Sequence, residues 1–416
     1  MGKLSYPVHF FFCNQWDQSP EMMRKMVDIS MERNNAAGEI AGETGIEGLR
    51  LDFNNGLRLQ IPDGNWHVTI RDYDSGITFF DQDVSKVILI SIEKYYIHWQ
   101  IEVFHDGEPA FGHIFDPAEQ KIRLMFVSGL IGDMQSFLPY IPMVRDYWQA
   151  DVYYSIDSRM SEICGRLFPD IRQADRIEEG TYATFYFAAG LRLWGWTPID
   201  GRTFPMTQMG QMILGLPYAP PKPAWVPGTR VIKEPYVCIG VQASTAGKGW
   251  HYPRGWDEVT DYLKSQGYRV LCIDKEKKYR SKLTDYSMEM PQGAEDFTGD
   301  RPLIERADML GHAEFFVGLC SGLSWLARTA DCPVVMIGGF TMYWTEFPTP
   351  YRVYNRLICN GCYNDLRINW QGNGCERHWA GSPEILQCSK KITPRMVIQA
   401  IDRLIADKKA GRIKRA

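Results

Sequence analysis

The first part of the chain alternates short apolar runs with clusters of turn-forming residues. After a helical pattern over residues 21–34, runs such as His67-Val-Thr-Ile70 alternate polar and apolar positions, and breaks such as Pro62-Asp-Gly64 separate them. An alternation of period two between turn signals is typical of antiparallel strands. The pattern predicts strands over residues 56–61, 66–71, 76–80, 86–92 and 95–104. We therefore expect a small β barrel or sandwich over residues 1–118.

A different rhythm begins at Lys121. A continuous apolar run over residues 122–128 precedes a glycine-containing loop, one helical pattern extending to Trp148, and a second apolar run over residues 150–155. Strand, helix and strand in this order form the unit of a parallel sheet. We expect a Rossmann-like domain over residues 119–227, which ends in a proline-rich linker at residues 217–227 because proline fixes φ and lacks an amide donor.

A second α/β domain is predicted over residues 228–355. Helical patterns over residues 256–266 and from about residue 301 alternate with apolar runs, and Gly267 is placed to cap the first helix. The predicted strands are residues 236–241, 268–273, 315–317 and 334–337. Two such domains predict a cleft between them. In the last segment, residues 393–416, Thr393-Pro394 is a typical start for a final helix.

Composition narrows the class of protein. The chain has 416 residues, of which 45% are hydrophobic and 23% charged, as in ordinary globular proteins with more than one domain. The net charge of −4 offers no basic field for nucleic acid, and the basic run at residues 408–415 is typical of a solvated tail. No apolar stretch is long enough to span a membrane, and the N-terminus does not resemble a signal peptide. We therefore expect a cytoplasmic protein.

Four of the ten cysteines are clustered, at Cys359, Cys362, Cys375 and Cys388. Six others are scattered and fit small buried hydrophobes. Four thiolates at such spacing make the closed tetrahedral shell of a structural metal site, so we expect a metal finger over residues 356–392. Zinc is the usual ion and iron also accepts four thiolates, and the spacing does not separate them. Two disulfides or four free thiols are the alternative. His378 is expected to be a bystander.

Three short polar loops follow predicted strands, at the sheet edge where α/β proteins bind ligands. In Gly129-Leu-Ile-Gly-Asp133 the carboxylate is suited to accept a proton from an attacking hydroxyl, although a plain tight turn has the same sequence. Ser244-Thr-Ala-Gly-Lys248 offers hydroxyls, a glycine and a lysine to a diphosphate, or is simply an exposed loop. Its spacing is not that of an ATP-hydrolysing loop. Ser321-Gly-Leu-Ser-Trp325 places helix N-terminal amides at the same edge.

Several motifs together resemble one known family. They are Ser244-Thr-Ala-Gly247, Pro253-x-Gly-Trp256, residues 321–327, Gly339-Phe-Thr341, residues 346–353 and Cys359-Asn-Gly-Cys362. In this order they resemble the bacterial autotransporter heptosyltransferases (autotransporter strand-loop-strand O-heptosyltransferases), from about residue 121 to the C-terminus. More distantly, the two α/β domains are similar to the lipopolysaccharide heptosyltransferases of the GT-B fold.

The resemblance implies an enzyme that transfers heptose from ADP-heptose, with inversion, to serine hydroxyls of an autotransporter adhesin. It implies Asp133 as the catalytic base, iron rather than zinc in the finger, and a large homo-oligomer, a dodecamer. The donor contacts it implies are Thr245, Lys248, Ser321, Gly322 and Leu323, with Lys282 in reserve for the lysine. One departure is Cys320, which stands where lipopolysaccharide relatives often carry an acidic residue.

Two other functions remain open at this point. One is a transferase that uses another nucleotide sugar or another acceptor, such as a lipopolysaccharide core. The other is a non-catalytic adaptor that holds a partner through the finger and the β domain. If Asp133 were not the base, Asp106 near the domain junction is the next candidate.

Overall fold

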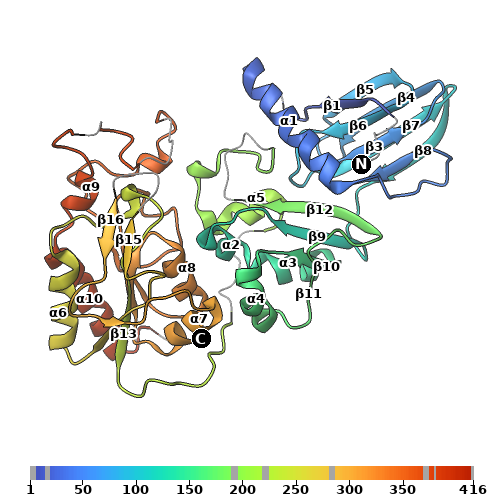
Figure 1. Cartoon of the computed structure of the whole chain (residues 1–416). Coiled ribbons are helices and arrows are strands. Elements are labelled where there is room, and N and C mark those ends of the chain that lie inside the picture. The colour runs from blue at the N-terminus through green and yellow to red at the C-terminus, as the bar shows by residue number, and fades with distance from the viewer. Residues whose placement is uncertain are drawn as a thin grey trace.

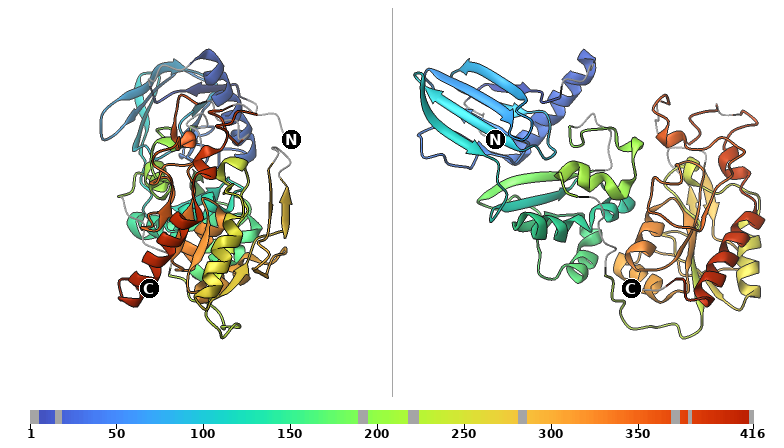
Figure 2. Two further views of the ribbon diagram at one scale, coloured as in Figure 1. Left: turned by 90° about the vertical axis from the view of Figure 1, so that its left-hand side faces the viewer. Right: turned by 180° about the vertical axis from the view of Figure 1, so that it is seen from behind.

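The computed structural model describes residues 6–14, 19–188, 195–217, 224–280, 286–368, 374–378 and 381–413. Three parts follow one another across the molecule, with the first α/β unit between the N-terminal β part and the second α/β unit (Figure 1). The view from behind shows the same order (Figure 2). Among the described residues, no helix is long and apolar enough to cross a membrane.

The N-terminal part contains two four-stranded sheets and one long helix. The antiparallel sheet has the order β5-β4-β7-β8, formed by Thr78–Val84, Trp66–Asp72, Trp99–His105 and Glu108–Ile114. The second sheet has the order β1-β6-β3-β2, formed by Val8–Phe11, Val87–Ser91, Arg58–Ile61 and Arg50–Asp52. Helix α1 (Pro20–Ala37) begins where the Ser19 hydroxyl accepts the Met22 amide. The expected helix and antiparallel strands are confirmed, and the alternating residues Val68 and Ile70 are buried.

The first α/β unit is a parallel sheet in the order β11-β10-β9-β12. Its strands are β9 (Lys121–Phe126), β10 (Asp151–Ser155), β11 (Arg172–Gln173) and β12 (Thr181–Phe187). Its helices are α2 (Ile131–Phe137), α3 (Tyr140–Trp148), α4 (Ser161–Leu167) and α5 (Met209–Leu214). The prediction of one helix extending to Trp148 is wrong. Pro139 divides it, because proline has no amide to continue the hydrogen bonds of α2 and instead precedes α3.

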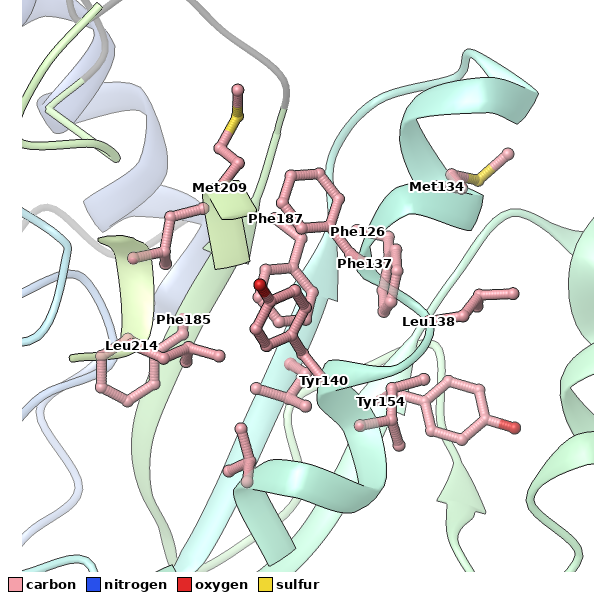
Figure 3. Packing of buried hydrophobic residues seen from close by; sticks show 14 of the residues in the cluster. Phe126, Met134, Phe137, Leu138, Tyr140, Tyr154, Phe185, Phe187, Met209 and Leu214 are labelled. Atoms are coloured by element: carbon pink, nitrogen blue, oxygen red, sulfur yellow. The ribbon is translucent and has the colours of Figure 1, made fainter. Parts of the chain in front are cut away.

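An aromatic core holds α2 against this sheet (Figure 3). Phe137 of α2 stacks on Phe187 of β12 with ring centroids 4.8 Å apart, and Phe126 of β9 meets the same ring at 5.1 Å. Tyr140, which begins α3, is fully buried and donates its hydroxyl to the Thr207 carbonyl at 2.7 Å. Burial of side chains this large contributes roughly 2 kcal/mol each, so the end of α2 is fixed by packing.

The second α/β unit is a six-stranded parallel sheet in the order β17-β14-β13-β18-β19-β20. Its strands are Glu295–Asp296, Arg269–Cys272, Tyr236–Gly240, Phe316–Leu319, Val334–Ile337 and Arg352–Val353. The helices are α6 (Gly255–Ser265), α7 (Leu303–His312), α8 (Gly322–Thr329), α9 (Gln387–Lys390) and α10 (Pro394–Lys409), and a hairpin joins β15 (Lys278–Arg280) to β16 (Ser287–Glu289). Gly267 has φ +85° after α6, and Thr393 accepts the Met396 amide at the start of α10, both as predicted.

The two α/β units meet where α2 packs against α8. A Cβ at Gly132 would lie 2.9 Å from Cδ1 of Trp325, so only glycine permits this approach. The Gln135 side chain donates to the Gly322 carbonyl at 3.3 Å and accepts the Thr329 hydroxyl at 2.8 Å. This contact brings the loops at the carboxyl ends of both sheets to one place. The predicted linker lies partly outside the described residues, at 218–223.

Candidate active site

A cavity of about 800 Å³ lies at the meeting of the two α/β units. Its walls come from residues 129–133, Ser158, Arg159, Glu162 and Met206 of the first unit, and from residues of the second unit, most of them in strand-end loops. The structure brings together five of the predicted site residues in this lining: Asp133, Lys248, Ser321, Gly322 and Leu323. Thr245 is buried beside the lining in the same loop as Lys248. Lys282 lies outside the described residues.

Asp133 lies in the first turn of α2, where its carboxylate lines the cavity. Burial raises its pKa, while the charge of Lys248 and a hydrogen bond from Ser128 act against that rise. The Ser128 hydroxyl donates to Oδ2 of Asp133 at 2.9 Å and itself accepts the Leu130 amide at 3.1 Å. The position of the helix N-cap is Leu130, so Asp133 does not serve as the cap of a plain turn. A carboxylate made more basic by burial is suited to accept a proton.

Residues 244–251 follow strand β13, and we call them the donor loop after the donor contacts expected for Thr245 and Lys248. A short 3₁₀ turn over Ala246–Lys248 directs the lysine to the cavity. Among the described residues, the buried hydroxyl of Thr245 has no hydrogen-bond partner. A buried hydroxyl without a partner is costly unless a ligand satisfies it. The donor loop therefore offers a hydroxyl and a cation to an anionic group in the cavity.

The N-terminus of α8 forms the opposite part of the wall. Ser321 has extended backbone angles at the N-cap, and its side chain makes no capping hydrogen bond within the described structure. Gly322 and Leu323 follow in the first turn, where amide hydrogens lack intrahelical acceptors and carry partial positive charge. Such a helix start is suited to phosphate oxygens, which agrees with the role expected for these three residues.

Sequence reasoning missed two charged residues of the cavity, Asp274 after β14 and Arg306 in α7. Asp274 is buried, and its carboxylate accepts the amides of Val241 at 2.7 Å and Gln242 at 3.3 Å. Burial raises the pKa of Asp274 to about 6. Arg306 donates to the Asp274 carbonyl at 3.1 Å, and both residues line the cavity. The position of Asp274 directly after an apolar strand was the signal that could have found it.

A second group that sequence reasoning missed surrounds Cys320, the residue before the N-cap of α8. Arg352 donates to Oε2 of Glu346 at 2.5 Å and to Sγ of Cys320 at 3.2 Å, and Thr341 donates to Oε1 of Glu346 at 2.8 Å. Glu346 and Cys320 both line the cavity, so a carboxylate is present next to Cys320 although position 320 is not acidic. Its partner Arg352 is almost fully buried, which makes this a fixed charge pair.

The cysteine segment is residues 356–392, and its described parts, 356–368, 374–378 and 381–392, lie beside the second α/β unit. Burial, followed by the charges of Cys359, Cys362 and Cys375, raises the pKa of Cys388 to about 12. His378, expected to be a bystander, has its Nε2 3.8 Å from Sγ of Cys359. Over the described part of the chain, no three histidine, cysteine, aspartate or glutamate side chains form a group that could hold a metal ion. The expected metal finger is therefore not confirmed.

Asp106, the reserve candidate for the base, lies in the turn between β7 and β8. Its side chain is 72% exposed and lies 3.8 Å from Nε2 of His105. It does not line the cavity. The structure thus separates Asp106 from the residues that could bind a donor.

Comparison with known proteins gives the family. Residues 217–367 match the model of glycosyltransferase family 9 (heptosyltransferase), and residues 45–107 match the N-terminal domain of glycosyltransferase TibC. The autotransporter heptosyltransferase BAHTCr of Citrobacter rodentium (strain ICC168) is 36% identical over 380 residues, covering 88% of this chain and 92% of the relative. The chain belongs to the autotransporter heptosyltransferase family. One member, BimC of Burkholderia thailandensis (strain ATCC 700388 / DSM 13276 / CCUG 48851 / CIP 106301 / E264), described as inactive, is 30% identical over 368 residues, or 86% of each chain.

A solved structure of the family has the same fold. The iron-containing dodecameric glycosyltransferase TibC from enterotoxigenic Escherichia coli H10407 superposes with a TM-score of 0.82 at 33% identity, covering 89% of this chain and 98% of TibC. TibC in complex with ADP-D-β-D-heptose superposes with a TM-score of 0.81 at 34% identity, covering 88% and 97%. The present chain is an α/β glycosyltransferase, as the sequence motifs indicated, and its residues 45–107 match the N-terminal domain of TibC.

Proposed function

We propose that the chain is a protein O-heptosyltransferase that moves heptose from ADP-heptose to serine hydroxyls of an autotransporter adhesin. The observation that carries the proposal is the convergence of Asp133, Lys248 and the start of α8 on one cavity. A base, a cation and a helix N-terminus are what an inverting transfer from a nucleoside diphosphate requires. The complex of TibC with ADP-D-β-D-heptose supports the choice of donor.

The transfer is a single displacement. Asp133 takes the proton of the acceptor serine while the serine oxygen attacks the anomeric carbon and the bond to ADP breaks. Lys248, Thr245 and the amides of Gly322 and Leu323 stabilise the negative charge that develops on the departing diphosphate. Charge stabilisation by groups already held in place usually contributes most to such reactions, because it needs no rearrangement as the reaction proceeds.

Asp274 and Arg306 extend the same cavity away from Asp133. Fixed in place by the amides of Val241 and Gln242, the Asp274 carboxyl is suited to accept hydrogen bonds from nucleoside hydroxyls. Glu346, held by Arg352, presents a second carboxylate near the N-terminus of α8, where the sugar of the donor would lie. These assignments place the nucleoside toward β14 and the reacting sugar toward Asp133.

Cys359, Cys362, Cys375 and Cys388 are the residues that would hold iron, with zinc as the alternative ion. The all-thiol donor set is of the kind that closes a tetrahedral shell, and the iron in TibC supports the choice of ion. When bound, such an ion supplies structure rather than chemistry. We also propose a dodecamer, as in TibC, and action in the cytoplasm.

The test is to incubate the purified enzyme and an autotransporter adhesin with ADP-heptose, and in parallel with other nucleotide sugars. Intact-mass spectrometry of the adhesin should show added heptose with ADP-heptose alone. Transfer from another nucleotide sugar, or to a lipopolysaccharide core but not to protein, would favour the other transferase function. Absence of transfer from every donor would favour an inactive adaptor. The relative BimC, described as inactive, shows that the family includes inactive members.

A further inference from the structure

The donor loop is joined directly to the residues that follow Cys388. The Ser389 hydroxyl donates to the Gly249 carbonyl at 2.6 Å and accepts the His251 amide at 2.8 Å. Between these two contacts, Trp250 donates its indole N–H to the Ile392 carbonyl at 2.9 Å. Ser389 and Trp250 are 2% and 1% exposed, so water cannot easily replace these bonds.

A second contact joins the same loop to the residue before Cys375. A Cβ at Gly247 would lie 2.5 Å from the carbonyl oxygen of Gly374. A Cβ at Gly374 would lie 3.1 Å from the Cβ of Ala246. The two backbones thus approach each other more closely than side chains would allow. The cysteine segment therefore contacts the donor loop on both sides of Lys248.

These contacts fix the turn that bears the proposed diphosphate ligands. Within the loop, the Lys248 amide donates to the Thr245 carbonyl at 3.2 Å and the Gly249 amide donates to the Ala246 carbonyl at 3.0 Å. The carbonyl of Gly249 is the acceptor for Ser389, so the end of the turn is tied to the cysteine segment one residue after Lys248. A short turn with few bonds of its own keeps one shape only if its ends are held.

We propose that Ser389 is a positioning residue for the donor, which together with Trp250 holds the donor loop in the shape that receives the diphosphate. This rests on the proposed function, in which Thr245 and Lys248 contact the donor. The cysteine segment then supports the reaction without contacting the substrate, because Ser389, next to Cys388, holds Thr245 and Lys248 in the positions that contact the diphosphate. A loop held in advance loses less entropy when the nucleotide binds, so the effect appears in affinity.

The test compares Ser389→Ala with Ser382→Ala in the full-length holoenzyme. Ser382 lies in the same cysteine segment, is also buried and bonds to Glu384, but its hydrogen bonds stay within residues 382–385. ADP affinity is measured by calorimetry and donor KM and kcat by initial rates. We expect Ser389→Ala to weaken ADP binding about ten-fold and to raise KM, with kcat at saturating donor changed less than about three-fold. Ser382→Ala should leave ADP affinity unchanged.

Trp250→Phe provides an independent variant that removes the bond to Ile392 and part of the buried indole ring while keeping an aromatic side chain. It should weaken ADP binding in the same direction, by about three- to ten-fold. Equal ADP affinity in Ser389→Ala, Trp250→Phe and the unsubstituted enzyme would overturn the positioning role while leaving the proposed function intact. If the unsubstituted enzyme itself does not bind ADP, the proposed donor is wrong and this inference falls with it.

Discussion

The hydrogen bond from Ser128 to Asp133 leads to a defined change in the pH dependence of transfer. Ser128 accepts the Leu130 amide, so its own hydrogen is directed to Oδ2 of Asp133 at 2.9 Å. This bond favours the charged carboxylate and opposes the rise in pKa that burial causes. A hydrogen bond to a charged group contributes about 1.5 kcal/mol or more, which corresponds to about ten-fold in an equilibrium constant, so Ser128→Ala should raise the pKa of Asp133.

The sign follows from the role of Asp133 as a base. Only the deprotonated carboxylate accepts the serine proton, so a higher pKa shifts the loss of activity on the acid side to higher pH. On that side kcat/KM of Ser128→Ala should be about ten-fold below the unsubstituted enzyme, and the two profiles should converge at alkaline pH. The assay is the initial rate of heptose transfer over a range of pH at subsaturating donor.

Ser136→Ala is the matched control for this measurement. Ser136 lies in α2 together with Asp133, is buried, and donates to the main-chain carbonyl of Asp133 at 2.7 Å rather than to its carboxylate. In Ser136→Ala the loss of activity on the acid side should occur at the same pH as in the unsubstituted enzyme. A Ser128→Ala profile that is lowered uniformly at every pH, or not displaced relative to Ser136→Ala, would refute the reasoning.

Three further predictions concern other parts of the chain. Gly132→Ala places a Cβ 2.9 Å from the Trp325 ring and should lower the free energy of unfolding by about 1–3 kcal/mol in chemical denaturation. Gly129→Ala, whose Cβ meets nothing within 4 Å, should leave it unchanged. Equal stability of the two variants would contradict the tight contact between α2 and α8. Burial lowers the pKa of Lys94 to about 7, so between about pH 7 and its unfolded value of 10.5 the unfolded chain holds a proton that the folded chain lacks. Stability should therefore rise with pH in that window, by at most about 1.4 kcal/mol per pH unit, and Lys94→Met should remove this rise in urea titrations; an unchanged slope would show that Lys94 is not buried neutral. Asp106→Asn should transfer heptose at the unsubstituted rate, and a loss of ten-fold or more would return Asp106 to the list of candidate bases.

Continuous apolar runs predicted the parallel strands well. β19 covers Val334–Ile337 as expected, because a buried strand needs apolar residues on both faces. Local capping signals also held, since Thr393-Pro394 and Gly267 act through neighbouring residues alone. The division at Pro139 was visible in the sequence and was overlooked. So was β12, Thr181–Phe187, whose β-branched and aromatic residues are typical of a strand.

The loops of the site were predictable in position but not in their connections. Asp133, Lys248 and Ser321 follow strands, and strand ends share one edge of a sheet. Asp274 also follows a strand and could have been found in the same way, whereas Glu346 joins the site only through the order of the strands, which no local pattern encodes. The bonds between Ser389 and the donor loop link residues about 140 positions apart, Gly249 to Ser389, so they could be seen only in the folded chain.

The central claim is that Asp133 is the base of a heptosyl transfer. The most direct measurement compares Asp133→Asn with the unsubstituted enzyme in two assays, ADP binding by calorimetry and heptose transfer to the adhesin by intact mass. Asparagine keeps the size of the side chain but cannot take the proton. The account predicts transfer reduced by about 10²–10⁴ with ADP affinity within about three-fold of the unsubstituted enzyme. Transfer at the normal rate by Asp133→Asn would contradict it.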